Sequence, residues 1–216
     1  TASVADGAYK ITYNLGNTDI LWASAVAQDY NGTTGFNAAY CRAVKLDGVD
    51  SQYYPKFQYS HLLTALVFRI VGKDNDIENY DVKVTGMQIT NTSSTATLCI
   101  ADSKGEQSGV FTGSEDGGSI GFTDLDVAPT ATESDLCTIL AMPARNYTAA
   151  ITLTVDGANK STVALPLGST DGRTKYDAGY IYYFTVTINS PQEITIVETG
   201  LKEWIPGTNP TPGGEI

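Results

Sequence analysis

The chain has 216 residues, with 13 Lys and Arg against 24 Asp and Glu, and a net charge of −11. This acidity argues against binding to nucleic acid or to an anionic membrane surface, because both favour basic patches. The 42% of hydrophobic and 17% of charged residues are typical of a globular protein. No segment approaches the roughly 20 apolar residues of a membrane span.

The first 54 residues carry two strand signals followed by a polar stretch. Residues 8–13 and 20–27 are predicted to be strands that pair with each other around the turn Asn14-Leu15-Gly16-Asn17. Residues 30–54 are rich in Gly, Asn and Tyr, which indicates a long loop or irregular excursion.

The middle of the chain contains its most hydrophobic strand. Residues 62–71 form an almost unbroken apolar run, which predicts a central strand with both faces buried. In residues 82–90 the apolar positions change phase at Gly86, and this indicates a β-bulge. Residues 94–101 predict a further strand, and residues 103–118 predict an acidic loop.

A hairpin signal follows in residues 149–155 and 161–167. The two runs are joined by a segment that begins with Asp156-Gly157, a favoured tight-turn dipeptide. Pro166 lies near the end of the return strand, which predicts that this strand is at a sheet edge or ends there.

The last quarter of the chain contains a strictly alternating run, residues 180–188. In an extended chain the even-numbered side chains from Tyr182 to Ile188 line one face, and Thr185 and Thr187 line the other. We therefore expect a strand on a half-buried surface.

A second C-terminal strand is predicted around residues 194–197, after a break at Asn189-Ser190-Pro191. It ends at Trp204-Ile205-Pro206-Gly207, and a Pro/Gly-rich tail follows. A terminal strand is of interest because a sheet edge is where another chain can pair. Many short strands without a helical period predict an all-β fold, an antiparallel β-sandwich.

Four motifs in this order and spacing resemble one known family. They are Asp19-Ile20-Leu21-Trp22-Ala23, a run from Phe57 to Phe68 that is expected to be a strand, Ala141-Met142-Pro143-Ala144, and the C-terminal series Tyr180-x-Tyr182, Ile194-x-Ile196 and Trp204-Ile205-Pro206-Gly207. Together they resemble the fimbrillin-like (minor-fimbria-like, type V pilin) family of surface pilins, from about Asp19 to Gly207. Each motif alone is typical of many strands, so the specificity lies in their order.

The resemblance implies a Greek-key-like, transthyretin-like sandwich and a non-enzymatic subunit of a cell-surface fimbria (pilus) that contributes to cell adhesion. In this family an extended segment of one subunit completes the sheet of the next, which is a form of β-augmentation. The implied partners are other pilin subunits. The implied location is the cell surface after export across the outer membrane, with a lipoprotein precursor. The predicted donor segment consists of Ile194, Ile196, Val197, Leu201 and Trp204.

The chain departs from this family in its domain organisation. Full-length members resemble two consecutive sandwich domains, but only about 55 residues precede the Phe57-to-Phe68 run, too few for a complete first sandwich. We predict a reduced or truncated N-terminal β portion (1–54), a principal β-sandwich domain (55–206) and a flexible C-terminal tail (207–216). Thr1 is either a natural processing site or a boundary of the sequence.

The tyrosines of the predicted long loop support an alternative, a carbohydrate-binding or adhesive tip module. Sugar rings can stack on exposed aromatic side chains, and binding residues concentrate on loops held by a rigid scaffold. The candidate residues are Tyr30, Tyr40, Tyr53 and Tyr54. The partner would then be a host or bacterial surface glycan or protein.

Signals for catalysis and metal binding are weak. His61, the single histidine, begins the most hydrophobic strand, and the chain has neither a Gly-x-Ser-x-Gly nor a His-Glu-x-x-His motif. We interpret it as a structural histidine and predict no enzyme, catalytic residue or cofactor. Residues 74–78 are acidic but lack the glycine and the distal glutamate of a calcium loop, and the acidic segment 115–118 is shorter still. We interpret both as solvated turns and predict no metal site.

The three cysteines, Cys41, Cys99 and Cys137, have neither Cys-x-x-Cys nor zinc-ligand spacing. An odd number permits one disulfide with one free thiol, or three free thiols. Cys99 and Cys137 lie in apolar, strand-like runs, where a free cysteine behaves as a small hydrophobic residue. We therefore favour three unpaired thiols.

Overall fold

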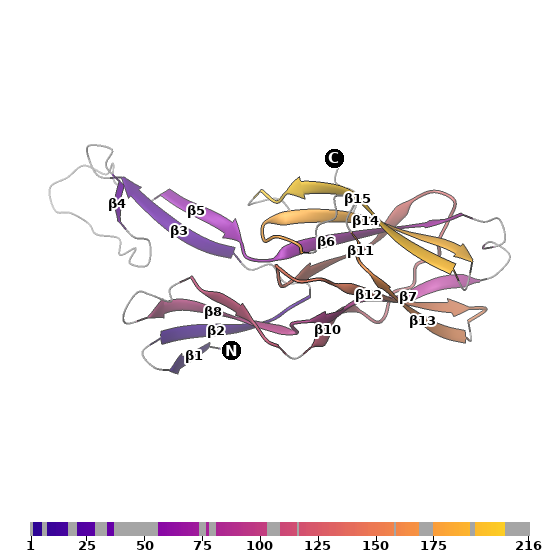
Figure 1. The fold of residues 1–216 in the computed structure, drawn as a ribbon, viewed down its shortest axis with the longest axis horizontal. Helices are drawn as coiled ribbons and strands as arrows, with labels where there is room; N and C mark the ends of the chain where they lie inside the picture. The colour runs from indigo at the N-terminus through magenta and orange to yellow at the C-terminus, as the bar shows by residue number, and fades with distance from the viewer. Residues whose placement is uncertain are drawn as a thin grey trace.

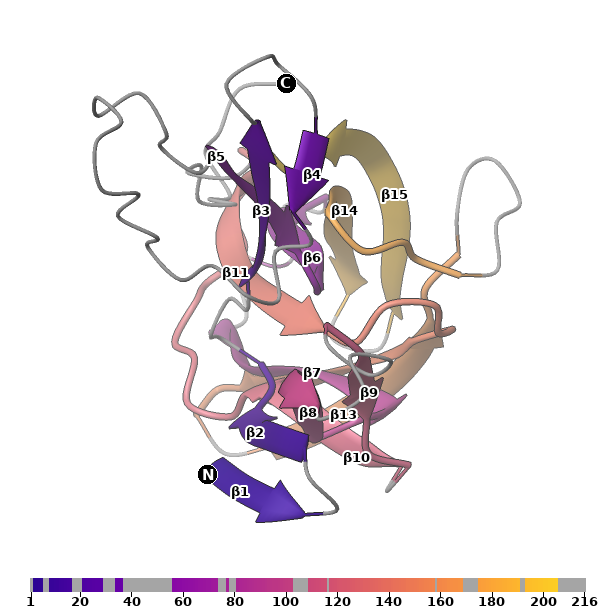
Figure 2. The ribbon, with the colours of Figure 1, turned by 90° about the vertical axis from the view of Figure 1, so that its left-hand side faces the viewer.

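The computed structural model describes residues 2–5, 8–16, 21–28, 34–36, 56–73, 77, 81–102, 109–115, 117–157, 159–168, 175–190 and 193–205. Within these ranges the elements are β-strands. They form an elongated molecule of two layers, which is seen from the side in Figure 1 and along its length in Figure 2. The all-β sandwich predicted from the sequence is confirmed.

Two four-stranded sheets form one half of the molecule. The first has the order β11 (Ser134–Ala141), β6 (Thr64–Gly72), β14 (Tyr180–Ser190) and β15 (Glu193–Glu203). The second, which lies beneath it in Figure 1, has the order β10 (Gly118–Phe122), β7 (Val82–Thr92), β12 (Thr148–Val155) and β13 (Asn159–Pro166).

The other half contains the N-terminal strands. One sheet has the order β1 (Ala2–Ala5), β2 (Ala8–Asn14), β8 (Thr95–Asp102) and β9 (Phe111–Gly113). A three-stranded sheet has the order β4 (Thr34–Phe36), β3 (Leu21–Gln28) and β5 (Lys56–His61). The predicted domain boundary at residue 54 stays a prediction, and the β2–β8 pairing joins strands from its two sides.

The core lies between the β11-β6-β14-β15 sheet and the β10-β7-β12-β13 sheet. Its fully buried side chains include Phe68 on β6 and Phe184 on β14, whose ring centroids are 5.3 Å apart. Met87 on β7 and Ile151 on β12 belong to the same cluster. Burying one such apolar side chain stabilises the fold by about 1.5–3 kcal/mol. The sandwich therefore depends mainly on this interior.

Several predicted features are confirmed. β6 is a central strand whose first five residues are all buried. The ladder between β7 and β12 shifts register next to Gly86, as expected for a β-bulge. β12 and β13 form the predicted hairpin, with positive φ at Asp156 and Gly157, and Pro166 ends the edge strand β13.

The predicted pairing of the first two strands is wrong. β2 pairs with β1 and β8, whereas β3 pairs with β4 and β5. The chain leaves β2 towards the other layer: the amide of Leu15 donates to the carbonyl of Ser94, and the amide of Gly16 donates to that of Leu140. Long-range partners therefore override the local turn signal.

Three other predictions need correction. Part of the expected loop 103–118 is the strand β9, which pairs with β8. The run from Phe57 to Phe68 is two strands, β5 and β6, separated at Leu62 and Leu63. β14 is more than half-buried: within residues 181–188 only Thr185 is partly exposed, and all the others are buried.

Gly121 on β10 holds a backbone that other residues would strain. Its φ is +137°, and a Cβ there would overlap the backbone carbonyl oxygen of Met87 on β7. Gly117 also has a positive φ, +61°, but a Cβ there would meet nothing within 4 Å. Gly117 therefore reports the cost of an ordinary left-handed backbone, whereas Gly121 adds a less accessible φ and an overlap with the neighbouring strand.

We predict that Gly121→Ala lowers the free energy of unfolding by about 3 kcal/mol or more, because strain at φ and overpacking add. Gly117→Ala, the matched control, should cost about 1 kcal/mol. Urea denaturation followed by circular dichroism measures both. Equal losses for the two variants would contradict the close approach of β10 to β7.

Cys137 is a buried free thiol on β11. Burial raises its pKa from 9.0 to about 12, because the thiolate would lose its hydration. Above pH 9 the unfolded chain releases a proton that the folded chain retains. The stabilisation present below pH 9 is therefore lost as the pH rises towards 12.

We predict that stability falls above pH 9 by up to about 1.4 kcal/mol per pH unit through this thiol. Urea denaturation at a series of alkaline pH values measures the slope. Cys137→Ala should have a shallower slope than the unaltered protein, and identical slopes would show that the thiol is not responsible.

Candidate assembly site

β15 is an edge strand that belongs to the sheet of its own chain. It pairs with β14 along its whole length, from Glu193 opposite Ser190 to Glu203 opposite Tyr180. No described strand pairs with its other edge. Its outward-facing N–H and C=O groups can therefore pair with a second chain.

The side chains of β15 divide into buried and exposed sets. Ile194 is buried, Ile196 is partly buried, and the carboxyl-bearing Glu198 is also buried. Val197 and Leu201 are 52% and 45% exposed. The ladder shifts register between Glu198 and Gly200, which indicates a bulge.

Trp204 fixes the end of β15. Its backbone N–H donates to the carbonyl oxygen of Gly179 at 2.8 Å, and its ring stacks on His61 with centroids 3.7 Å apart and planes at 12°. Trp204 is 3% exposed, whereas the next residue, Ile205, is 58% exposed. The final anchor of the strand is therefore Trp204, on the junction between β5 and β6.

A cluster of buried tyrosines packs around the segment that leads to Gly179, the residue that accepts the hydrogen bond from Trp204. Tyr176 is fully buried between Tyr147 and Tyr182, with ring centroids 5.3 and 4.8 Å away, and its hydroxyl donates to the carbonyl of Leu167 at 3.2 Å. The amide of Gly179 donates to the carbonyl of Leu63 at 2.9 Å. These contacts position the carbonyl of Gly179, which accepts the hydrogen bond from the backbone N–H of Trp204.

Tyr147 extends this cluster. Burial raises the pKa of its hydroxyl well above the usual range, so the group stays protonated and donates to the carbonyl of Met142. The sequence interpretation missed Tyr176, because it lies in a polar connection. A lone tyrosine before the strong strand at Tyr180 was the available signal.

The structure places the predicted site residues in three groups. Ile194 and Trp204 belong to the core of their own chain, with Ile196 packed against it. Val197 and Leu201 are both about half exposed, on the two sides of the register shift. The proposed ligand-loop residues lie outside the described part of the chain: Tyr30, Tyr40, Tyr53 and Tyr54.

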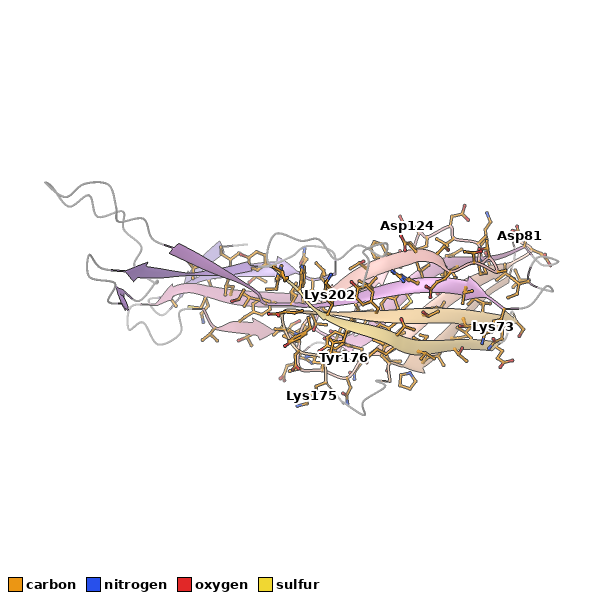
Figure 3. The ribbon with its side chains drawn as sticks, turned by 90° about the horizontal axis from the view of Figure 1, so that it is seen from above. Lys73, Asp81, Asp124, Lys175, Tyr176 and Lys202 are labelled. Atoms are coloured by element: carbon orange, nitrogen blue, oxygen red, sulfur yellow. The ribbon has the colours of Figure 1, made fainter. Side chains whose placement is uncertain are left out.

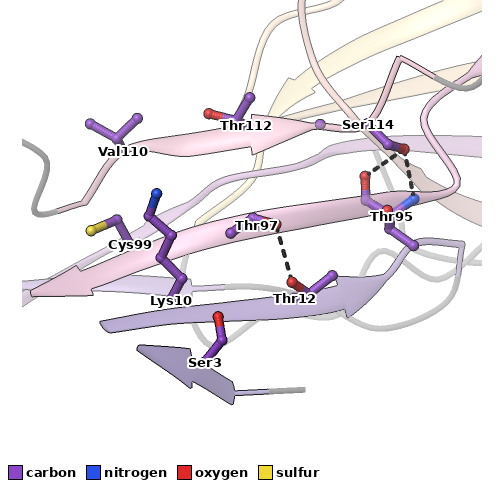
Figure 4. Close-up of a pocket in the computed structure, with 10 residues that line it drawn as sticks. Ser3, Lys10, Thr12, Thr95, Thr97, Cys99, Val110, Thr112 and Ser114 are labelled. Carbon is purple, nitrogen blue, oxygen red and sulfur yellow. Dashed lines mark hydrogen bonds between the residues drawn. The ribbon is translucent and has the colours of Figure 1, made fainter. Parts of the chain in front are cut away.

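A polar hollow of about 500 Å³ lies on the sheet formed by β1, β2, β8 and β9 (Figure 4). Lys10, Thr12 and Thr97 are among its lining residues, and the hydroxyls of Thr12 and Thr97 are 3.2 Å apart. The lining contains no aromatic side chain on which a sugar ring could stack. The hollow therefore does not support the glycan-binding alternative, which stays a prediction.

A search of the described residues for clustered metal ligands finds no group of three or more His, Cys, Asp or Glu. The predicted acidic turns fall partly outside the described ranges, at residues 74–76, 78 and 116. Within the same described ranges, no helix has the length and hydrophobicity to span a membrane.

The fimbrillin-like family model matches residues 1–204 of the sequence. The chain therefore belongs to the fimbrillin-like family, as the motifs predicted. A search of curated proteins gives no match.

Several solved bacterial structures are similar to this chain at low sequence identity. One, from Bacteroides uniformis and described as a cell adhesion protein, is 15% identical with a TM-score of 0.46, over 91% of this chain and 72% of that chain. A fimbrial protein from Bacteroides vulgatus is 16% identical with a TM-score of 0.40, over 68% and 56%. The tip fimbrial protein Mfa3 from Porphyromonas gingivalis is 10% identical with a TM-score of 0.34, over 68% and 52%.

We predict that Trp204→Ala lowers the free energy of unfolding by about 3–5 kcal/mol, because it removes a buried ring that packs on His61. Ile205→Ala, at the adjacent exposed position, should change it by no more than about 0.5 kcal/mol. Urea denaturation measures both variants. A small loss for Trp204→Ala would show that the end of β15 is not anchored there.

Proposed function

We propose that the protein is a structural, non-enzymatic subunit of a cell-surface fimbria that polymerises by β-strand donation and contributes to cell adhesion. Membership of the fimbrillin-like family supports a fimbrial role. The observation that carries the donation step is β15, an 11-residue edge strand with exposed apolar side chains. The partners would be further pilin subunits at the cell surface.

Donation from β15 would exchange one set of backbone hydrogen bonds for an equivalent set. The strand already satisfies one edge by pairing with β14, so a neighbour that offers a similar edge can replace that ladder. Ile194 and Trp204 would leave their own core, and the acceptor must bury them again. Polymerisation therefore needs an additional gain beyond this exchange.

The exposed apolar residues can supply that gain. In a regular strand, odd-numbered side chains share a face, so Val197, Leu201 and Ile205 would align once the bulge is removed. All three are about half exposed in the single chain. Burying them in a neighbour's groove would stabilise the polymer by about 25 cal/mol for each Å² of apolar area buried.

Head-to-tail assembly requires the donating and accepting sites to be different surfaces. β15 begins next to the end of β14, at the end of the molecule that lies opposite β3 and β4 (Figure 1). An acceptor in the N-terminal half would make the contact heterologous, and this geometry extends into a fibre unless the rotation closes a ring.

The donation step is tested by placing charges at the exposed apolar positions of β15. Val197→Asp combined with Leu201→Asp should leave the monomer folded, because both positions are exposed, but should abolish fibres, because a carboxylate cannot enter an apolar groove. Electron microscopy and sedimentation measure assembly, and thermal denaturation measures folding.

The matched control adds the same charge to the other edge strand on this side of the sandwich. Thr162→Asp combined with Ala164→Asp lies on exposed positions of β13 and should leave fibre assembly intact. Normal fibres from the β15 double variant would refute donation by this segment. Deletion of residues 193–216 should also abolish fibres, but it removes core residues as well, so the point variants are more informative.

A further inference from the structure

β6 and β14 form a parallel ladder at the centre of their sheet. The pairing runs from Ala65 opposite Ile181 to Gly72 opposite Ile188 without a register shift. The other described ladders are antiparallel, and most of them contain an irregularity. β11 and β15 flank the pair, so neither strand is at a sheet edge.

The start of β6 and the end of β14 lie at opposite ends of this half of the molecule. β6 begins beside the junction with β5 at Leu62 and Leu63, while β14 runs parallel to β6 and ends at Ser190, shortly before β15 begins at Glu193. Lys73, which follows β6, lies at the far end of the molecule in Figure 3, and its amide donates to the carbonyl of Ile188 at 3.1 Å. The start of β6 and the end of β14 are therefore distant points.

We propose that the β6–β14 ladder carries the tensile force that acts on the subunit within a fimbria, an inference that rests on the proposed fimbrial function. If β15 is donated, tension leaves the chain at Ser190. Tension from an acceptor site in the N-terminal half enters β6 through its junction with β5. The two forces pull the parallel strands in opposite directions along their axes, which loads the ladder in shear.

A ladder that is loaded in shear resists rupture by force, because its backbone hydrogen bonds must all break at the same time. In a parallel pair the hydrogen bonds are evenly spaced, so a force along the strands is shared among them. A force that separates the strands from one end breaks the same bonds one after another. Resistance to forced unfolding is set by the barrier of the unfolding step rather than by the equilibrium stability.

Side chains on both faces strengthen this pair. On the inner face Phe68 stacks on Phe184, and Val186 is fully buried beside Ile70. On the outer face the carboxylate of Glu133 accepts hydrogen bonds from both strands. Thr185 on β14 donates to it at 2.6 Å, and Arg69 on β6 donates at 3.5 Å.

Single-molecule force spectroscopy of the isolated chain tests the proposal. Handles attached through bioorthogonal amino acids at positions 60 and 190 load the ladder in shear. Handles at positions 73 and 190 peel the same ladder from one end. We expect the 60/190 geometry to rupture at a several-fold higher force at the same pulling speed, and equal forces in the two geometries would overturn the proposal.

A matched pair of substitutions separates the ladder from general stability. Val186 on β14 and Val84 on β7 are both valines with no exposed surface, in different sheets. Val186→Ala should lower the 60/190 rupture force, whereas Val84→Ala should lower the equilibrium stability to a similar extent without lowering that force. An equal drop in force for both variants would overturn the proposal.

This experiment is independent of fibre assembly. If the ladder fails the force test while fibres still depend on β15, the mechanical inference is wrong and the proposed function stands. If the ladder passes and fibres do not depend on β15, the proposed donation step is wrong and the ladder has no demonstrated load to carry.

Discussion

The structure depends on the apolar interior between the β11-β6-β14-β15 sheet and the β10-β7-β12-β13 sheet. β6 and β14 contribute Phe68 and Phe184 from one sheet, and β7 and β12 contribute Met87 and Ile151 from the other. Interiors of this kind are closely packed, so a change in one strand is transmitted to the others. The edge strand β15 has a defined position because Ile194 and Trp204 reach this core. An assembly step that removes β15 must therefore act on the same interior that defines the monomer.

The features predicted correctly from the sequence are those with a local cause. The hairpin of β12 and β13 follows from the Asp156-Gly157 turn, and the bulge follows from the phase change at Gly86. Pro166 identifies the edge strand because it lacks an N–H group for a further ladder. The apolar run of β6 indicates burial on both faces, which does not require knowledge of its neighbours.

The features predicted incorrectly depend on partners far along the chain. β2 pairs with β8 rather than with β3, although a turn signal directly follows β2 in the sequence. The alternation in β14 indicates a strand but does not reveal its parallel pairing with β6. At the candidate site the alternation shows that Ile194 and Ile196 share a face, but not which face the core covers. Trp204 was predicted to end a strand and to belong to the donor segment. Its anchoring contacts were not predicted, because His61 and Gly179 come from other segments.

The two edge strands on one side of the sandwich differ in how well they resist pairing with another chain. β13 and β15 contact each other there, and β13 carries Pro166, which limits extension of its ladder. β15 has no proline, and its protection consists of a bulge and the charged pair Lys202 and Glu203 near its end. In the proposed donation step, the bulge would be lost when β15 straightens against a second subunit. Val197 and Leu201 would then share a face, so the same step would remove the bulge that limits pairing and align the two exposed apolar side chains. The geometry of β15 therefore fits a strand that is held in its own sheet until a better partner is available.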